Sequence, residues 1–177
     1  MDLGNWSFDI NFSGSTVVTV FISGKTLVCA NVGDSRAILG SLKSTQEAEM
    51  IKPTQGEFQI ESIACKADND LYWVATTLSI DHKPDRKDEF EWILVSNGRV
   101  DPFREPDGQP IGPARVWLKE ENIPGLAMSW SMGDWVASSV GVIPEPEFFE
   151  LELNRDDKFI VIASDGIWEF IDNNKCV

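Results

Sequence analysis

The clearest pattern in the chain is a pair of β-branched runs at residues 16–22 and 26–32, separated by Ser-Gly-Lys. Val, Ile and Thr favour strands, and a glycine at the reversal supplies the positive φ that a tight hairpin turn needs. A second reversal at residues 33–35 leads into a third apolar run at residues 36–40. The pattern predicts an antiparallel meander of three strands.

Two further strands are predicted near the end of the sequence. Residues 148–153 alternate partly between apolar and acidic positions, so we expect Glu150 and Glu152 to face solvent. Residues 159–163 form an apolar run that is preceded by Asp-Asp-Lys and ends at Ser-Asp-Gly, which is typical of a strand covered on both faces. We expect these two strands to pair with each other.

The middle of the sequence mixes strand, helix and loop signals. Residues 41–70 are interpreted as a variable excursion with one or two short strands, and residues 71–78 as a further strand. Residues 99–113 are rich in Pro, Gly and Asp, and this composition predicts a loop. A short strand at residues 114–118 and a short apolar helix that ends at Gly133 complete the interpretation.

One amphipathic helix is predicted at residues 85–96. Phe90, Ile93 and Leu94 have the i, i+3, i+4 spacing of a helix that packs by one face. Asn-Gly at residues 97–98 is a helix stop, because both residue types tolerate the left-handed conformation. The chain is therefore predicted to be rich in strands and poor in helices.

Length and charge limit the classes of function. A chain of 177 residues, of which 42% are hydrophobic, can bury a core as one globular domain. Fifteen basic and 29 acidic residues give a net charge of −14, which repels nucleic acid and anionic membranes and favours cations or basic partners. No apolar run is long enough to span a bilayer. We therefore expect neither nucleic-acid binding nor membrane insertion.

The three cysteines, Cys29, Cys65 and Cys176, are widely spaced and include no Cys-x-x-Cys pair. They lack a histidine cluster that would indicate zinc, and their odd number favours a reducing compartment over a disulfide framework. The polar start of the chain lacks the apolar region of a secretory signal. We expect an intracellular, cytoplasmic protein.

Chemistry is predicted at the end of the apolar run at residues 159–163. Ser-Asp-Gly follows this run, so a stiff strand would hold the Asp165 carboxylate in a fixed direction. Gly166 would let the backbone turn sharply or be approached closely. A carboxylate in this position suits a site shared with other acids, and the obvious use of such a site is metal binding.

Five short motifs occur in order along the chain: Gly-Ser-Thr at 14–16, Asn-Val-Gly-Asp-Ser-Arg at 31–36, Asp-His-Lys-Pro at 81–84, Ser-Met-Gly-Asp at 131–134 and Ala-Ser-Asp-Gly-Ile-Trp at 163–168. With these motifs the chain resembles the metal-dependent protein serine/threonine phosphatases of the protein phosphatase 2C type. The resemblance implies an α+β fold, a sandwich of antiparallel β-sheets flanked by helices. Residues 1–177 would form a partial phosphatase domain, with the variable excursion at 41–70 inside it.

The resemblance also implies a chemistry, in which a metal-activated water hydrolyses phosphoserine or phosphothreonine in a phosphoprotein substrate. The resemblance implies Mg²⁺ or Mn²⁺ as the metal. Acidic residues suit these ions, because hard divalent cations prefer carboxylate and water oxygens and neutralise charge on a phosphoryl group. Asp165 matches the family's strand-end metal ligand. Asp34 matches an aspartate of an additional, weaker metal position, and Glu169 stands where the family commonly has Asp.

Structural roles are the alternative for the residues in these motifs. Gly-Asp pairs are common turn formers, so Asp34 and Asp134 can be turn residues. His82 can order a turn or a helix entrance, and Trp130 and Trp168 can pack in a core. Trp130 also stands where the family usually has Arg, which places the local hydrogen-bond network in question.

The chain departs from the family pattern at both ends, since the Asp-Gly-His-Gly-Gly segment before Gly-Ser-Thr and the later Gly-x-x-Asp-Asn segment are absent. Three explanations stay open: a fragment of a longer enzyme, a truncated homologue kept as a binding element, or missing segments on another chain. Two functions follow, a phosphatase and a catalytically inactive interaction module. Exposed sheet edges would then be covered by a protein partner.

Overall fold

The computed structural model describes residues 9–50, 61–67 and 70–177, so part of the predicted excursion at 41–70 lies outside the described residues. The chain divides into two compact units. The first, here called the motif unit, contains Met1–Val17, Val32–Asp34 and Asp81–Pro146. The second, here called the sandwich unit, contains Val18–Asn31, Ser35–Ile80 and Glu147–Val177.

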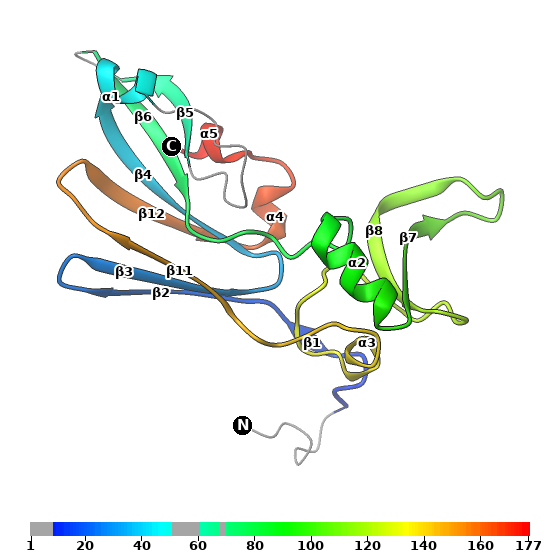
Figure 1. Ribbon diagram of the computed structural model, residues 1–177. Helices are drawn as coiled ribbons and strands as arrows, with labels where there is room; N and C mark the ends of the chain where they lie inside the picture. The colour runs from blue at the N-terminus through cyan, green and yellow to red at the C-terminus, as the bar shows by residue number, and fades with distance from the viewer. Residues whose placement is uncertain (1–8, 51–60, 68–69) are drawn as a thin grey trace. The chain divides into compact units, whose positions relative to one another are not determined.

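Two antiparallel sheets build the described part of the sandwich unit (Figure 1). One has the strand order β11-β3-β2, and the other has the order β12-β4-β6-β5. The first sheet consists of β2 (Val17–Ser23), β3 (Thr26–Val32) and β11 (Glu147–Glu152). The second consists of β4 (Arg36–Ser44), β5 (Glu61–Lys66), β6 (Leu71–Thr77) and β12 (Asp157–Ala163).

A hydrophobic core lies between these two sheets. Leu27 and Cys29 of β3 are buried together with Ala37 and Leu39 of β4, and apolar side chains of β2, β11 and β12 pack against them. Burial raises the pKa of the Cys29 thiol to about 11, so the thiol stays neutral and packs as an apolar group. Alternate residues of β3 and β4 thus form the centre of the core, as in other sandwiches.

The predicted hairpin of β2 and β3 is confirmed, but two predicted pairings are wrong. β4 does not extend the β2–β3 hairpin, because the turn after β3 carries the chain into the other sheet. β11 pairs with β3, and β12 pairs with β4, so β11 and β12 are not partners. Stacking two apolar faces buries both of them, whereas a single flat meander would leave one apolar face in water.

Short helices accompany the second sheet of the sandwich unit. They are α1 (Thr45–Met50), α4 (Asp165–Trp168) and α5 (Asn173–Cys176). Trp168 of α4 is buried with Ile38 and Ala75, and Cys176 and Val177 pack against the same cluster. The predicted exposure of Glu150 and Glu152 on β11 is confirmed.

The motif unit has smaller sheets and its own core. β1 (Gly14–Ser15) pairs with β10 (Met132–Gly133), and β7 (Gly98–Arg104), β8 (Pro110–Leu118) and β9 (Pro124–Leu126) form a second sheet. Two helices are described, α2 (Lys87–Val95) and α3 (Trp135–Ser138). The core of this unit consists of Ile93, Val116, Ala137, Val140 and Val142.

Two predictions for this unit need correction. The predicted loop at residues 99–113 is mostly the hairpin of β7 and β8, in which glycine and proline are accommodated next to a β-bulge. The predicted helix that ends at Gly133 is wrong, because Gly125 and Gly133 have φ values of 75° and 101°, and β9 and β10 occupy this segment.

The predicted helix at 85–96 is confirmed as α2, but the side that it buries differs from the prediction. Ile93 and Glu89 are buried, whereas Phe90 and Leu94 are 38% and 46% exposed. The described residues are mainly antiparallel strands with few helices, so the α+β fold class is confirmed. Among the described helices, none has the length and apolar character needed to cross a membrane.

Candidate functional site

The end of strand β12 in the sandwich unit places two carboxylates on one helical turn. Asp165 opens α4, and the backbone N–H of Glu169 donates to the Asp165 carbonyl oxygen at 2.9 Å. This i, i+4 spacing puts the two side chains on the same side of the turn. Both residues are exposed, and neither carboxylate has an ion-pair or hydrogen-bond partner among the described residues. The two carboxylates are therefore accessible to a cation from solvent.

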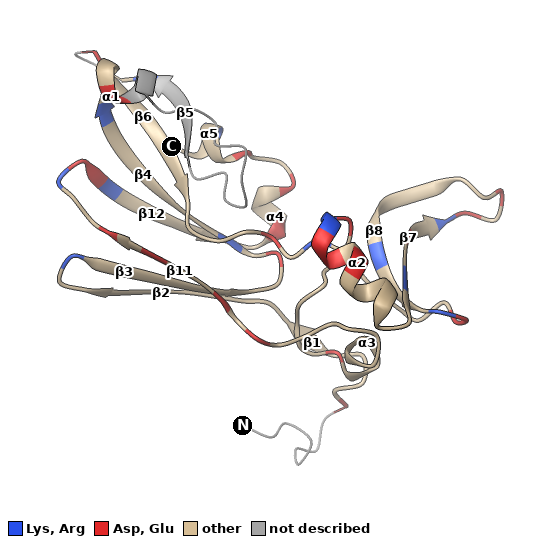
Figure 2. Cartoon of the chain, in the orientation of Figure 1, with Lys and Arg blue, Asp and Glu red and all other residues tan. Residues whose placement is uncertain are grey.

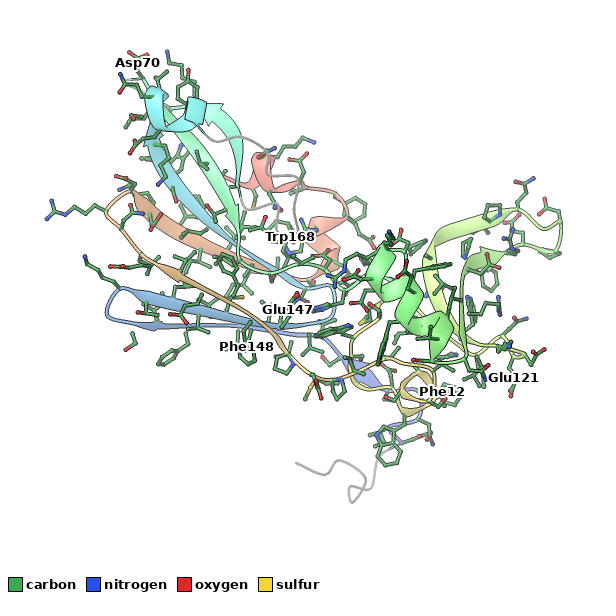
Figure 3. The ribbon with its side chains drawn as sticks, in the orientation of Figure 1. Phe12, Asp70, Glu121, Glu147, Phe148 and Trp168 are labelled. Carbon is green, nitrogen blue, oxygen red and sulfur yellow. The ribbon has the colours of Figure 1, made fainter. Side chains whose placement is uncertain are left out.

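Trp168 anchors this turn to the sheet. Its indole nitrogen donates to the carbonyl oxygens of Ala163 at 2.8 Å and Arg36 at 3.2 Å, and its ring lies between α4 and the strands (Figure 3). The Arg36 guanidinium lies 5.2 Å from the centre of that ring and donates to Asn173 at 2.7 Å. The prediction that Trp168 packs in a core is confirmed, and its packing gives Asp165 a fixed support.

The role expected for Gly166 is wrong. Gly166 lies inside α4 without a positive φ, and a Cβ added to it would have Ser164 Oγ as its nearest neighbour, at 3.7 Å. That distance is an ordinary van der Waals contact, so neither the turn nor a close approach requires glycine here. The chain turns by starting a helix after Ser164.

Asp34 lies in the motif unit, in a different environment. It follows Gly33, whose φ is 99°, and it is only 2% exposed. Its carboxylate forms an ion pair with the Lys83 ammonium. The backbone N–H of His82 donates to the Gly33 carbonyl at 3.1 Å, and His82 Nδ1 lies 3.0 Å from the backbone nitrogen and the carbonyl oxygen of Gly33. The fold thus joins Gly-Asp-Ser-Arg to Asp-His-Lys-Pro.

Two other motifs meet in the same unit. Gly14 of Gly-Ser-Thr pairs with Gly133 of Ser-Met-Gly-Asp in the β1–β10 bridge. Asp134 is left-handed, with φ 48° and ψ 53°, and its carboxylate accepts from the Ser131 hydroxyl at 2.6 Å. A Cβ on Gly14 would overlap the Asp134 carboxylate, so the close approach requires glycine. Asp134 is therefore a turn residue, as the structural alternative predicted.

The network around Trp130 accommodates the indole in place of arginine. The Trp130 ring stacks on the His82 ring with a centroid distance of 4.0 Å and an interplanar angle of 1°. Its Nε1 donates to Glu89 Oε2 at 2.9 Å, and Arg86 Nη2 donates to Glu89 Oε1 at 2.9 Å. The buried Glu89 carboxylate thus receives one donor from Trp130 and a positive charge from Arg86.

Sequence reasoning missed Glu89 and Arg86 as parts of this network. The available signal was their i, i+3 spacing at the start of the predicted helix, where Figure 2 shows acidic and basic positions together. Arg86 also donates to both Asp88 oxygens, at 2.8 and 2.9 Å. Burial of Asp88 opposes its ionisation, but the bonds and the charge of Arg86 outweigh this, and the pKa of Asp88 is lowered.

The two carboxylates at the end of β12 have a donor set that fits a hard divalent cation. Mg²⁺ commonly keeps several waters and is held by only one or two protein carboxylates, and Asp165 and Glu169 offer two. Asp34 fits less well, because the Lys83 ammonium already balances its charge. In the part of the chain that the structure describes, no three His, Cys, Asp or Glu side chains gather as a metal centre.

Comparisons with known proteins give one consistent family. The profile of Protein phosphatase 2C matches residues 7–177. "Probable protein phosphatase 2C 64" of Oryza sativa subsp. japonica is 37% identical over 97% of the chain and 34% of its own length. "Probable protein phosphatase 2C 72" of Arabidopsis thaliana is 38% identical over 96% of the chain and 43% of its own length. The chain thus spans less than half of the length of these relatives.

Solved structures show the same fold at lower identity. A serine-threonine phosphatase 2C from Toxoplasma gondii superposes with a TM-score of 0.67 at 18% identity, over 93% of this chain and 45% of the other. A Caenorhabditis elegans sex determining protein superposes with a TM-score of 0.60 at 19% identity, over 92% and 30%. At these identities the likeness concerns the fold alone.

Proposed function

Because the chain belongs to the protein phosphatase 2C family, we propose that it acts as a protein serine/threonine phosphatase that hydrolyses phosphoserine and phosphothreonine with Mg²⁺ or Mn²⁺. The observation that carries the proposal is the pair of accessible carboxylates at the end of β12. A rigid strand, a helical turn and a buried tryptophan support this pair. The substrate would be a phosphoprotein, as the family's name indicates.

In this proposal, Asp165 is the principal metal ligand and Glu169 a second one. Glu169 keeps the charge of an aspartate but reaches one methylene further, and the shared turn brings its carboxylate to the same side as that of Asp165. Asp34 would be a weaker ligand, because metal binding there has to compete with the Lys83 ammonium. The chemistry that Mg²⁺ or Mn²⁺ supplies is a lowered pKa of water and neutralised charge on the phosphoryl group.

The test measures phosphate release from a phosphothreonine peptide by the purified chain in Mn²⁺. We expect metal-dependent turnover that Asp165→Asn lowers by at least about 100-fold, since loss of even an indirect metal partner costs about 10- to 100-fold. Glu150→Gln is the matched control, because Glu150 is an exposed carboxylate on β11 of the same unit. Its turnover should equal that of the unmodified chain.

Isothermal titration with Mn²⁺ separates catalysis from metal binding. Binding that Asp165→Asn weakens, without turnover, would support the metal site and leave the chain as the inactive interaction module. Absence of both turnover and Mn²⁺ binding would contradict the catalytic proposal for this chain. The interaction module is favoured by one observation, the exposed apolar residues Phe21 and Phe148 on β2 and β11, at 64% each. Figure 3 shows Phe148 on the outside of its strand.

A further inference from the structure

The β7–β8 hairpin of the motif unit carries a cavity whose residues have no part in the proposed metal chemistry. The cavity has a volume of about 280 Å³. It lies on one face of the hairpin, and the loop that follows β8 contributes one side chain. Its walls include Arg99, Asp101, Phe103, Arg104, Trp117 and Asn122.

Two arginines in this cavity are held in place by neighbouring groups. The Arg99 guanidinium lies 5.5 Å from the centre of the Trp117 ring, and it donates to Asn122 Oδ1 at 2.9 Å. Arg104 donates to both oxygens of Asp101, at 2.8 and 3.3 Å, and Arg99 Nη1 lies 3.6 Å from the same carboxylate. These contacts fix both guanidinium groups before any ligand arrives, which lowers the entropy cost of binding.

The local backbone explains why the two arginines share one face. Side chains alternate along a strand, so Arg99 and Asp101 point to the same side. The register of the hairpin shifts between Pro102 and Phe103, and beyond this irregularity the Arg104 guanidinium bonds to the Asp101 carboxylate. The Trp117 indole donates to the Asp101 carbonyl at 2.8 Å and holds the opposite strand against the same face.

Charge and size indicate the class of ligand. Two guanidinium groups face one carboxylate, so the cavity has a net charge of +1 in a chain whose net charge is −14. One carboxylate would neutralise this excess charge, and arginine binds carboxylates through charge-assisted hydrogen bonds. The volume lies just below the range of about 300–1,000 Å³ for pockets that hold drug-sized ligands, and it suits one or two side chains. The Phe103 ring, which is 54% exposed, offers apolar contact beside the arginines, whereas Trp117 is buried and supports Arg99.

We propose that this cavity binds an acidic peptide segment, taking up a Glu or Asp side chain against Arg99 and Arg104 with a neighbouring apolar side chain on Phe103. Both arginines belong to β7, and Figure 2 shows the basic positions of this strand in blue. The inference does not depend on the proposed catalysis, because the binding of a peptide without phosphate is measured without turnover.

The experiment is a fluorescence anisotropy titration of the whole chain with a labelled peptide of Gly and Ser that carries one Glu-Leu pair. We expect saturable binding that weakens about tenfold when Gln replaces Glu in the peptide, and about tenfold in Arg99→Gln, because each change removes a charge-assisted hydrogen bond. Arg104→Gln should also weaken binding, and since Arg104 is 53% exposed this variant should fold normally. Arg155→Gln, an exposed arginine of the sandwich unit, is the control that should bind like the unmodified chain.

Three results would overturn the proposal. Equal affinity for the Glu and Gln peptides would show that the cavity does not recognise the carboxylate. Unchanged affinity in folded Arg99→Gln and Arg104→Gln, with circular dichroism as the check on folding, would place any binding elsewhere. A phosphoserine-Leu peptide that binds more tightly than the Glu-Leu peptide would show that the cavity prefers a dianion.

Discussion

The carboxylates of the motif unit and those at the end of β12 differ in what surrounds them. In the motif unit, Asp34, Glu89 and Asp134 are buried, and each has a partner that balances its charge or satisfies its oxygens. In the sandwich unit, Asp165 and Glu169 are exposed, without an ion-pair partner among the described residues. Motifs that look alike in sequence thus place aspartate in opposite environments.

The difference indicates which carboxylates can give up their present partners to bind a ligand. Separating a buried carboxylate from its partner cation lowers the free energy of unfolding, since an unpaired charge remains in a medium of low dielectric constant. An exposed carboxylate is solvated by water and loses only water when a metal ion binds. Acids of the first kind are suited to hold the fold together, and those of the second kind are suited to bind.

Lys83→Met should have the largest effect on stability. It leaves the buried Asp34 carboxylate without its cation, so we expect the free energy of unfolding to fall by roughly 3 kcal/mol. Asp165→Asn should change it by no more than about 0.5 kcal/mol, because the side chain is exposed. Urea unfolding monitored by circular dichroism measures both. Equal losses of unfolding free energy in the two variants would contradict the proposed difference between the buried and the exposed carboxylates.

Gly14→Ala should have the second-largest effect on stability. The added methyl group would overlap the Asp134 carboxylate and lie 2.6 Å from Ser131 Oγ, so we expect a loss of about 2 kcal/mol from overpacking. Gly166→Ala is the matched control at the other site, where there is room for a Cβ in a helix, and it should gain about 0.5 kcal/mol. Thermal unfolding measures the stability of both variants. An unchanged unfolding temperature for Gly14→Ala would contradict the prediction that the Asp134 carboxylate requires glycine at this position.

Trp130→Phe should have the smallest effect of the three. Phenylalanine keeps a ring against His82 but removes the donor to Glu89 Oε2, so we expect a loss of about 1–2 kcal/mol for an unsatisfied buried oxygen. Trp135→Phe is the control, because Trp135 is 51% exposed, and its unfolding free energy should stay within about 0.5 kcal/mol. A loss in Trp130→Phe no larger than in the control would mean that Arg86 alone satisfies Glu89.

Strand positions were predictable where the local pattern decides them. The β2–β3 hairpin follows from two β-branched runs around Ser-Gly, and β12 from its apolar run. The hairpin of β7 and β8 was not predictable from composition, because its prolines and glycines are typical of loops and a bulge accommodates the irregular pairing. The buried side of α2 was also missed, since Glu89 is buried by a hydrogen-bond network that joins distant segments.

The sequence alone determined the α+β class and the two strands that pair locally, and it placed Asp165 at the end of a strand, where its role as a metal ligand stays a prediction. The tertiary structure decided which sheet each later strand joins, that Asp34 is buried against Lys83, and that Trp130 bonds to Glu89. The physical reason is the sequence separation over which each kind of interaction acts. Propensity and turn chemistry act over a few residues, whereas sheet partners and buried charge pairs depend on contacts between segments that lie far apart in the sequence.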